Sequence, residues 1–147
     1  MDLKSLMVDS KSVWVPYPGC KGFEVEITNL SRKELIKLRT RCTSQKFDRK
    51  LRTVIEDLDE ERFVEEFTKA TVKNWKGLTI EHVESLVLIE IGDNPPETEV
   101  EFSLENAQML VSSSTEFDQW LNEVVFDLDN FRTGTKGKSA GKTGKTV

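Results

Sequence analysis

Residues 57–78, DLDEERFVEEFTKATVKNWKGL, constrain the fold more than any other stretch, because they predict an amphipathic helix with a recognisable start and end. Side chains suited to a core recur at helical spacing on one side of the segment: Phe63, Phe67, Ala70 and Asn74, flanked by Val64 and Thr71. We therefore expect a helix that packs this side against the rest of the protein.

Both ends of this helix carry local signals. Asp57, with Glu60 three residues later, is typical of a helix start, and the acidic first turns suit the positive end of the helix dipole. Gly77 predicts a left-handed residue that ends the helix. Trp75 and Leu78 would then fold back over the last turn.

The chain of 147 residues is long enough for one domain, which we place at residues 1–131. That part carries 16 basic and 26 acidic residues, a net charge of −10, whereas residues 132–147 contain five basic and no acidic residues. Gly, Lys, Thr and Ser dominate those last residues, so we expect a disordered basic tail. Residues 1–11 have little pattern and are expected to be loosely docked.

Short alternating segments predict strands. Residues 13–15 and 23–27 predict an N-terminal β-hairpin, and residues 86–91 and 98–102 predict a second one. Residues 43–56 are polar and basic; Val54 and Ile55 fit either a short strand or the approach to the next helix.

Three further helices are expected, which makes an α+β fold with about four helices in the body. The first begins at the Ser31 and Glu34 capping box, and the second at Ser103. The third begins near Thr115 and continues to residue 131, with a long apolar stripe: Phe117, Trp120, Leu121, Val124, Leu128 and Phe131.

Signals for chemistry are weak. The Gly141-Lys142-Thr143 sequence lacks the earlier glycine that a phosphate loop requires, and Asp127 and Asp129 lack the later ligands of a calcium loop. His82 is the single histidine, and Cys20 and Cys42 have no companions, so a four-ligand zinc site of Cys and His cannot form. We expect reduced, structural cysteines, no cofactor, no metal and no enzymatic activity.

The composition also bears on location and partners. No apolar run approaches the length of a membrane span, and residues 1–10 do not resemble a signal peptide. The helix after Ser31 has a basic face: Arg32, Lys33, Lys37, Arg39 and Arg41. A solvated face is a better interpretation than a nucleic-acid surface, because no aromatic residues lie between these charges for base stacking.

Three segments together resemble the tail assembly chaperones of long-tailed bacteriophages. They are residues 21–25 (KGFEV), residues 72–78 (VKNWKGL) and residues 102–106 (FSLEN), which leads on to Phe117 and Phe131. The most specific part is Trp75-Lys76-Gly77 followed by an aliphatic residue. The resemblance covers roughly residues 13–131 and departs from the family between residues 79 and 101, where this chain has an apparent insertion.

The resemblance implies a non-enzymatic protein of the host cytoplasm that is absent from the mature virion. Such a chaperone binds the tape measure protein, keeps it soluble and helps recruit the major tail tube protein. It also implies that a longer product made by programmed frameshifting could exist. Phe117, Trp120, Leu121 and Val124, or a groove beside them, are our candidates for partner binding. Self-association is a further expectation.

Two other classes stay open at this point. A tail completion or connector protein would be found in purified virions, whereas a chaperone would not. A small nucleic-acid-binding module would use the basic tail and the helix around Arg32 to Arg41, and its affinity would fall steeply with salt.

Overall fold

The computed structural model describes residues 1–8 and 10–132, and its fold is α+β, as predicted. The helices are α1 (Leu3–Leu6), α2 (Arg32–Arg41), α3 (Glu60–Thr71), α4 (Ile80–Leu86), α5 (Leu104–Ser113), α6 (Thr115–Phe126) and the 3-10 helix η1 (Leu128–Phe131). The strands are β1 (Ser12–Pro16), β2 (Glu24–Thr28), β3 (Thr43–Asp48), β4 (Thr53–Leu58) and β5 (Val72–Lys76). The predicted disordered tail lies almost wholly outside the described residues.

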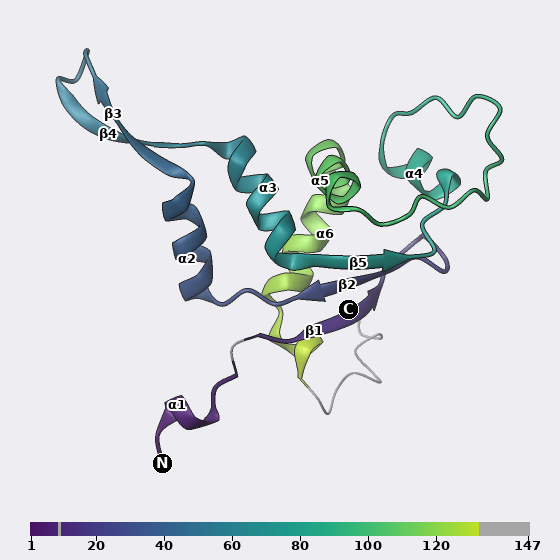
Figure 1. The fold of residues 1–147 in the computed structure, drawn as a ribbon, viewed down its shortest axis with the longest axis horizontal. Helices are drawn as coiled ribbons and strands as arrows, with labels where there is room; N and C mark the ends of the chain where they lie inside the picture. The colour runs from purple at the N-terminus through teal and green to yellow at the C-terminus, as the bar shows by residue number, and fades with distance from the viewer. Residues whose placement is uncertain (9, 133–147) are drawn as a thin grey trace.

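A three-stranded antiparallel sheet in the order β1-β2-β5 supports the body, and α3, α5 and α6 gather against it (Figure 1). The predicted N-terminal hairpin is confirmed, with Val15 opposite Val25 and Val13 opposite Ile27. Val25 and Ile27 are fully buried, while the alternating glutamates of β2 are partly exposed. The period-two pattern therefore positions the central strand correctly.

The helix predicted over residues 57–78 is shorter than expected and differs at both ends. Residues up to Leu58 belong to β4, and Asp59, not Asp57, caps α3 by accepting a hydrogen bond from the Arg62 N–H at 3.1 Å. The last part is not helical at all, because residues 72–76 form β5 beside β2. Pairing there buries Val72 and Trp75 and satisfies the backbone of β2, which outweighs the helical spacing.

Gly77 has the predicted positive φ, +77°, but it follows a strand and does not cap a helix. A Cβ atom at this position would lie 1.9 Å from the carbonyl oxygen of Gly22, in the turn between β1 and β2. The residue must therefore be glycine both for its backbone conformation and for this close approach.

The second hairpin was predicted in the wrong place. In residues 87–103 the structure has irregular backbone, with only an isolated bridge between Thr79 and Glu99, and residue 86 is the end of α4. The apolar residues there pack individually: the Val100 carbonyl accepts a hydrogen bond from Trp75 Nε1 at 2.9 Å, and Phe102 packs edge-on against Trp75. Backbone hydrogen bonds from the Ile80 N–H to the Thr98 carbonyl and from the Val100 N–H to the Leu78 carbonyl also hold the segment, so it is anchored to the core without forming a hairpin.

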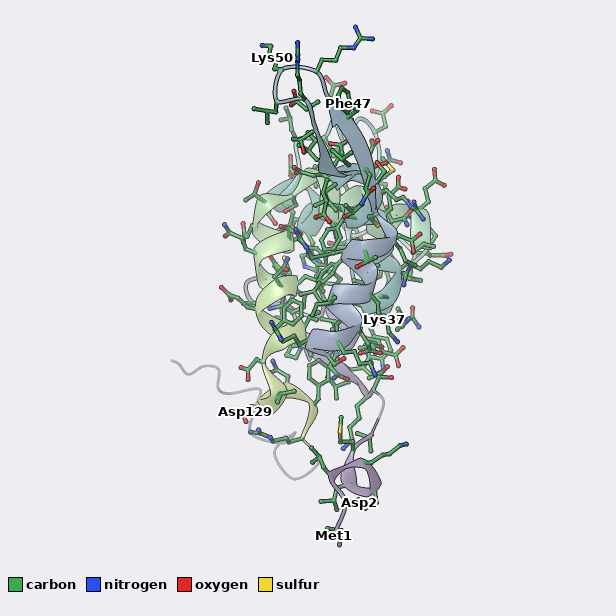
Figure 2. All side chains as sticks on the ribbon, turned by 90° about the vertical axis from the view of Figure 1, so that its left-hand side faces the viewer. Met1, Asp2, Lys37, Phe47, Lys50 and Asp129 are labelled. Carbon is green, nitrogen blue, oxygen red and sulfur yellow. The ribbon has the colours of Figure 1, made fainter. Side chains whose placement is uncertain are left out.

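The actual second hairpin is β3–β4, in the polar and basic segment, so the strand alternative for Val54 and Ile55 is correct. It projects away from the body beyond α2, at the upper left of Figure 1. Phe47 and Lys50 mark this end of the molecule in Figure 2, and Met1 and Asp2 mark the opposite end.

The remaining helix starts are confirmed, and one helix end is corrected. Ser31 forms the predicted capping box with Glu34, and Ser103 caps α5. The buried Ser114 caps α6. The predicted last helix is interrupted after Phe126, where the extended Asp127 starts η1, so the stripe does not continue unbroken to residue 131.

We expect Gly77→Ala to lower the free energy of unfolding by about 3 kcal/mol or more, since a positive φ and a clash with backbone act together. Gly92→Ala is the matched control, because Gly92 also has a positive φ, +64°, but has open space around it. Its expected loss is about 1 kcal/mol. Equal losses for the two variants in urea titration would contradict the close approach of Gly77 to Gly22.

Trp75→Ala should lower the free energy of unfolding by about 3–5 kcal/mol, because the side chain is 5% exposed and packs against Phe23 and Phe102. Trp14→Ala, on the partly exposed strand β1, should cost about 1 kcal/mol, mainly through the lost contact with Lys76. Denaturant titration measures both. A loss below about 1 kcal/mol for Trp75→Ala would show that Trp75 is not a core residue.

Candidate partner-binding surface

The four candidate residues on α6 do not form an exposed stripe. Phe117 and Leu121 are fully buried, Val124 is nearly so, and Trp120 alone is half-buried. The Trp120 ring packs edge-on against Tyr17, with centroids 4.7 Å apart, and Phe117 stacks on Tyr17 and Phe23. In this fold most of the stripe is therefore part of the protein's own core.

The segment Trp75-Lys76-Gly77 also has a structural role. Trp75 is a core residue, and Gly77 allows the turn at Gly22 to approach. Lys76 lies on the surface, with its Nζ 3.7 Å from a Glu24 carboxylate oxygen and 4.7 Å from the centroid of the Trp14 ring. Trp75 and Gly77 therefore serve the fold, and of the three residues only the exposed Lys76 offers surface to a partner.

A large apolar groove lies beside the end of α6, where it faces the start of α2 (Figure 2). We call it the α2–α6 groove; its volume is about 660 Å³. Its lining is Val8, Lys11, Asn29, Leu30, Ser31, Arg32, Leu35, Val125, Phe126, Leu128, Phe131 and Arg132. The volume is within the usual range for ligand and partner pockets.

Several large apolar side chains of this groove are accessible to solvent. Leu128 is 57% exposed, Val8 65% and Phe126 42%, whereas Phe131 and Val125 are buried and form part of the floor. The sequence predicts Leu128 and Phe131 on one helical stripe. In the structure both lie in η1, after the break at Asp127, where Phe131 is buried and Leu128 is exposed. The groove itself depends on residues from both ends of the chain, so helical spacing alone could not reveal it.

A second groove, of about 510 Å³, is lined by α3, α5 and the start of α6; we call it the α3–α5 groove. Five of its lining residues are acidic and none is basic: the acids are Glu60, Glu61, Glu65, Glu105 and Asp118. Val64, which is half-buried, and Met109, which is 60% exposed, provide apolar surface, and Val111 in the same lining is buried. Burial raises the pKa of the Asp118 carboxyl, opposed by a hydrogen bond from the Asn122 side chain. The groove thus combines negative charge with apolar contact area.

The groups that could carry chemistry have structural partners. His82 Nδ1 accepts a hydrogen bond from the Thr79 N–H in the cap of α4, and its ring stacks on Phe23. Burial, reinforced by the Glu116 carboxylate, raises the pKa of the Tyr17 hydroxyl. Within residues 1–8 and 10–132, no three His, Cys, Asp or Glu side chains are grouped so that they could hold a metal ion.

Comparison of the chain with models of protein families, with curated proteins and with solved structures finds no match. In the part of the chain that the structure describes, no helix has both the length and the apolar character needed to cross a membrane. The functional interpretation therefore starts from the two grooves and from the charge of the surface.

Both cysteines should react slowly with a thiol reagent in the native protein, because Cys20 and Cys42 are free and buried. For Cys20, burial also raises the pKa of the thiol, although a contact with Ser85 Oγ at 4.0 Å opposes this, so less thiolate is present at neutral pH. Absorbance after addition of Ellman's reagent measures the rate of thiol labelling. In urea, which unfolds the protein, both cysteines should be labelled fast. Fast labelling of either cysteine before unfolding would contradict the buried positions.

Proposed function

We propose that this protein is a tail assembly chaperone of a long-tailed bacteriophage, with no enzymatic activity, and that it binds the tape measure protein through the α2–α6 groove. The observation that carries the proposal is this open, largely apolar groove beside α6. The resemblance of residues 21–25, 72–78 and 102–106 to that family supports the choice of partner.

An amphipathic helix is the partner that suits such a groove. Helix-in-groove recognition places apolar side chains at helical spacing into a hydrophobic depression, and Leu30, Leu35, Phe126 and Leu128 supply apolar walls from two sides. A long helical tape measure protein exposes such apolar faces before the tail is built. Covering them in the groove competes with aggregation.

The binding must also be reversible, because tail tube subunits displace the chaperone as the tail grows. An interface limited to one groove of this size would be small, and small interfaces suit transient complexes. The net charge of −10 over residues 1–131 would keep the loaded complex dispersed in the host cytoplasm. Release during assembly leaves the chaperone absent from the mature virion, which distinguishes it from a tail completion or connector protein.

The test is co-expression of the tape measure protein with this chain. We expect the wild-type chain to raise the soluble yield of the tape measure protein several-fold, and Leu128→Glu to remove most of that gain. Leu128 is 57% exposed, so its replacement should leave the fold intact while placing a charge in the groove.

Leu88→Glu is the matched control, because Leu88 is fully exposed and lies outside the groove. It should rescue as well as the wild type. Equal yields of soluble tape measure protein with and without the wild-type chain would refute the proposed function. A Leu128→Glu variant that rescues fully would refute the role of the groove alone.

A further inference from the structure

Charge is strongly segregated along the chain. Residues 32–52, which form α2, β3 and the turn before β4, contain nine basic and two acidic residues, a net charge of +7. Residues 53–131 contain four basic and 20 acidic residues, a net charge of −16. Positive charge is therefore concentrated in α2 and at the outer end of the hairpin, whereas the chain from β4 onward is acidic.

The two acidic residues within residues 32–52 both accept hydrogen bonds from backbone N–H groups. Glu34 belongs to the capping box of α2, and Asp48 Oδ1 accepts hydrogen bonds from the N–H groups of Lys50 and Leu51 in the hairpin turn. At the base, Arg39 lies over the Phe63 ring and Arg41 pairs with Glu66. The basic residues farther out form no ion pair among the described residues: Lys46, Arg49, Lys50 and Arg52.

The end of the hairpin, residues 46–54, also exposes apolar side chains; we call it the hairpin tip. Phe47 is 60% exposed, Leu51 67% and Val54 56%, and Phe47 and Val54 lie opposite each other in the register, on one face. In the part of the chain that the structure describes, β3 and β4 pair only with each other. An isolated two-stranded hairpin is marginally stable in water, so a surface that covers this face would stabilise it.

The α3–α5 groove has the complementary properties. It offers five carboxylates and no basic side chain against the four basic side chains of the tip. Its apolar surface, with Met109 60% exposed beside Val64, matches the exposed Phe47, Leu51 and Val54. Charge complementarity of this kind orients partners and speeds their encounter, while apolar contact supplies affinity.

We propose that the hairpin tip of one copy of this protein docks in the α3–α5 groove of a second copy. The tip points away from its own body in both views, so the contact forms between molecules (Figures 1 and 2). Tip and groove are different surfaces, so the contact is head-to-tail, and each copy can use both at once to build an open chain or a ring. This proposal does not rest on the function proposed above.

A nucleic acid is the other polyanion that the basic residues could attract. The tip fits a protein better, because two aliphatic side chains, Leu51 and Val54, accompany its single aromatic ring. The acidic groove supplies a protein surface of the required sign within the same chain. Binding of the tip to duplex DNA is therefore the alternative result that the experiment distinguishes.

Sedimentation velocity of the full chain tests the proposal. The wild type should associate reversibly at low salt, with an apparent Kd at least tenfold weaker at about 0.5 M than at about 0.05 M NaCl, because salt screens the contact. Arg49→Glu/Lys50→Glu at the tip, or Glu61→Lys/Glu65→Lys in the groove, should each weaken association at least tenfold.

Two matched variants control for net charge. Lys33→Glu/Lys37→Glu changes exposed residues of α2 away from the tip, and Glu99→Lys/Glu101→Lys changes exposed residues outside the groove. Both should associate within about threefold of the wild type, since screened charges outside a contact contribute little. Circular dichroism would verify that every variant folds.

Mixing gives the sharpest result. The tip variant keeps an intact groove and the groove variant keeps an intact tip. A mixture of the two should therefore form a 1:1 dimer with the affinity of the wild-type contact, although each variant alone associates at least tenfold more weakly. The proposal fails if the wild type stays monomeric at about 0.5 mM in low salt, a concentration at which even a weak contact populates dimer. It fails equally if the mixture stays monomeric, or if a monomeric wild type binds duplex DNA through the tip.

Discussion

The pairing of β5 with β2 is the interaction on which the rest of the structure depends. It brings residues 72–76 beside residues 24–28, inserts Trp75 between Phe23 and Phe102, and places Gly77 against the carbonyl oxygen of Gly22. The indole N–H of Trp75 then holds the Val100 carbonyl, which ties the irregular segment before α5 to the sheet. Without this strand, β2 would lose one of its two neighbours and the helices would lose their common support.

How far the sequence predicts this arrangement depends on the range of the interactions involved. The helix starts at Ser31 and Ser103 are confirmed because a capping side chain acts on backbone three residues away. The N-terminal hairpin is confirmed because its alternation spans a few residues. Residues 72–76 become a strand only because a distant strand offers an edge, and no pattern within those five residues carries that information.

The same limit applies to the candidate surface. The sequence correctly indicates that α6 carries a long apolar stripe, and the structure shows that Phe117 and Leu121 are used within the core. The grooves beside α6 combine residues separated by more than fifty positions, such as Val8 with Leu128 or Glu61 with Asp118. The segregation of charge, in contrast, can be counted in the sequence. Only the structure shows that four of the basic residues lie at the end of a hairpin that projects from the body, where a second molecule can reach them.

The contact between Gly22 and Gly77 has a consequence for biosynthesis. The N-terminal hairpin is complete once residue 28 has been made, yet its sheet acquires a third strand only after residue 76, on the far side of α2, the second hairpin and α3. Contacts of such sequence separation form late, because loop closure must precede them. During translation, the second edge of β2 therefore stays unpaired until a long intervening segment has left the ribosome. We expect this interval to be the period in which the nascent chain is most exposed to incorrect pairing.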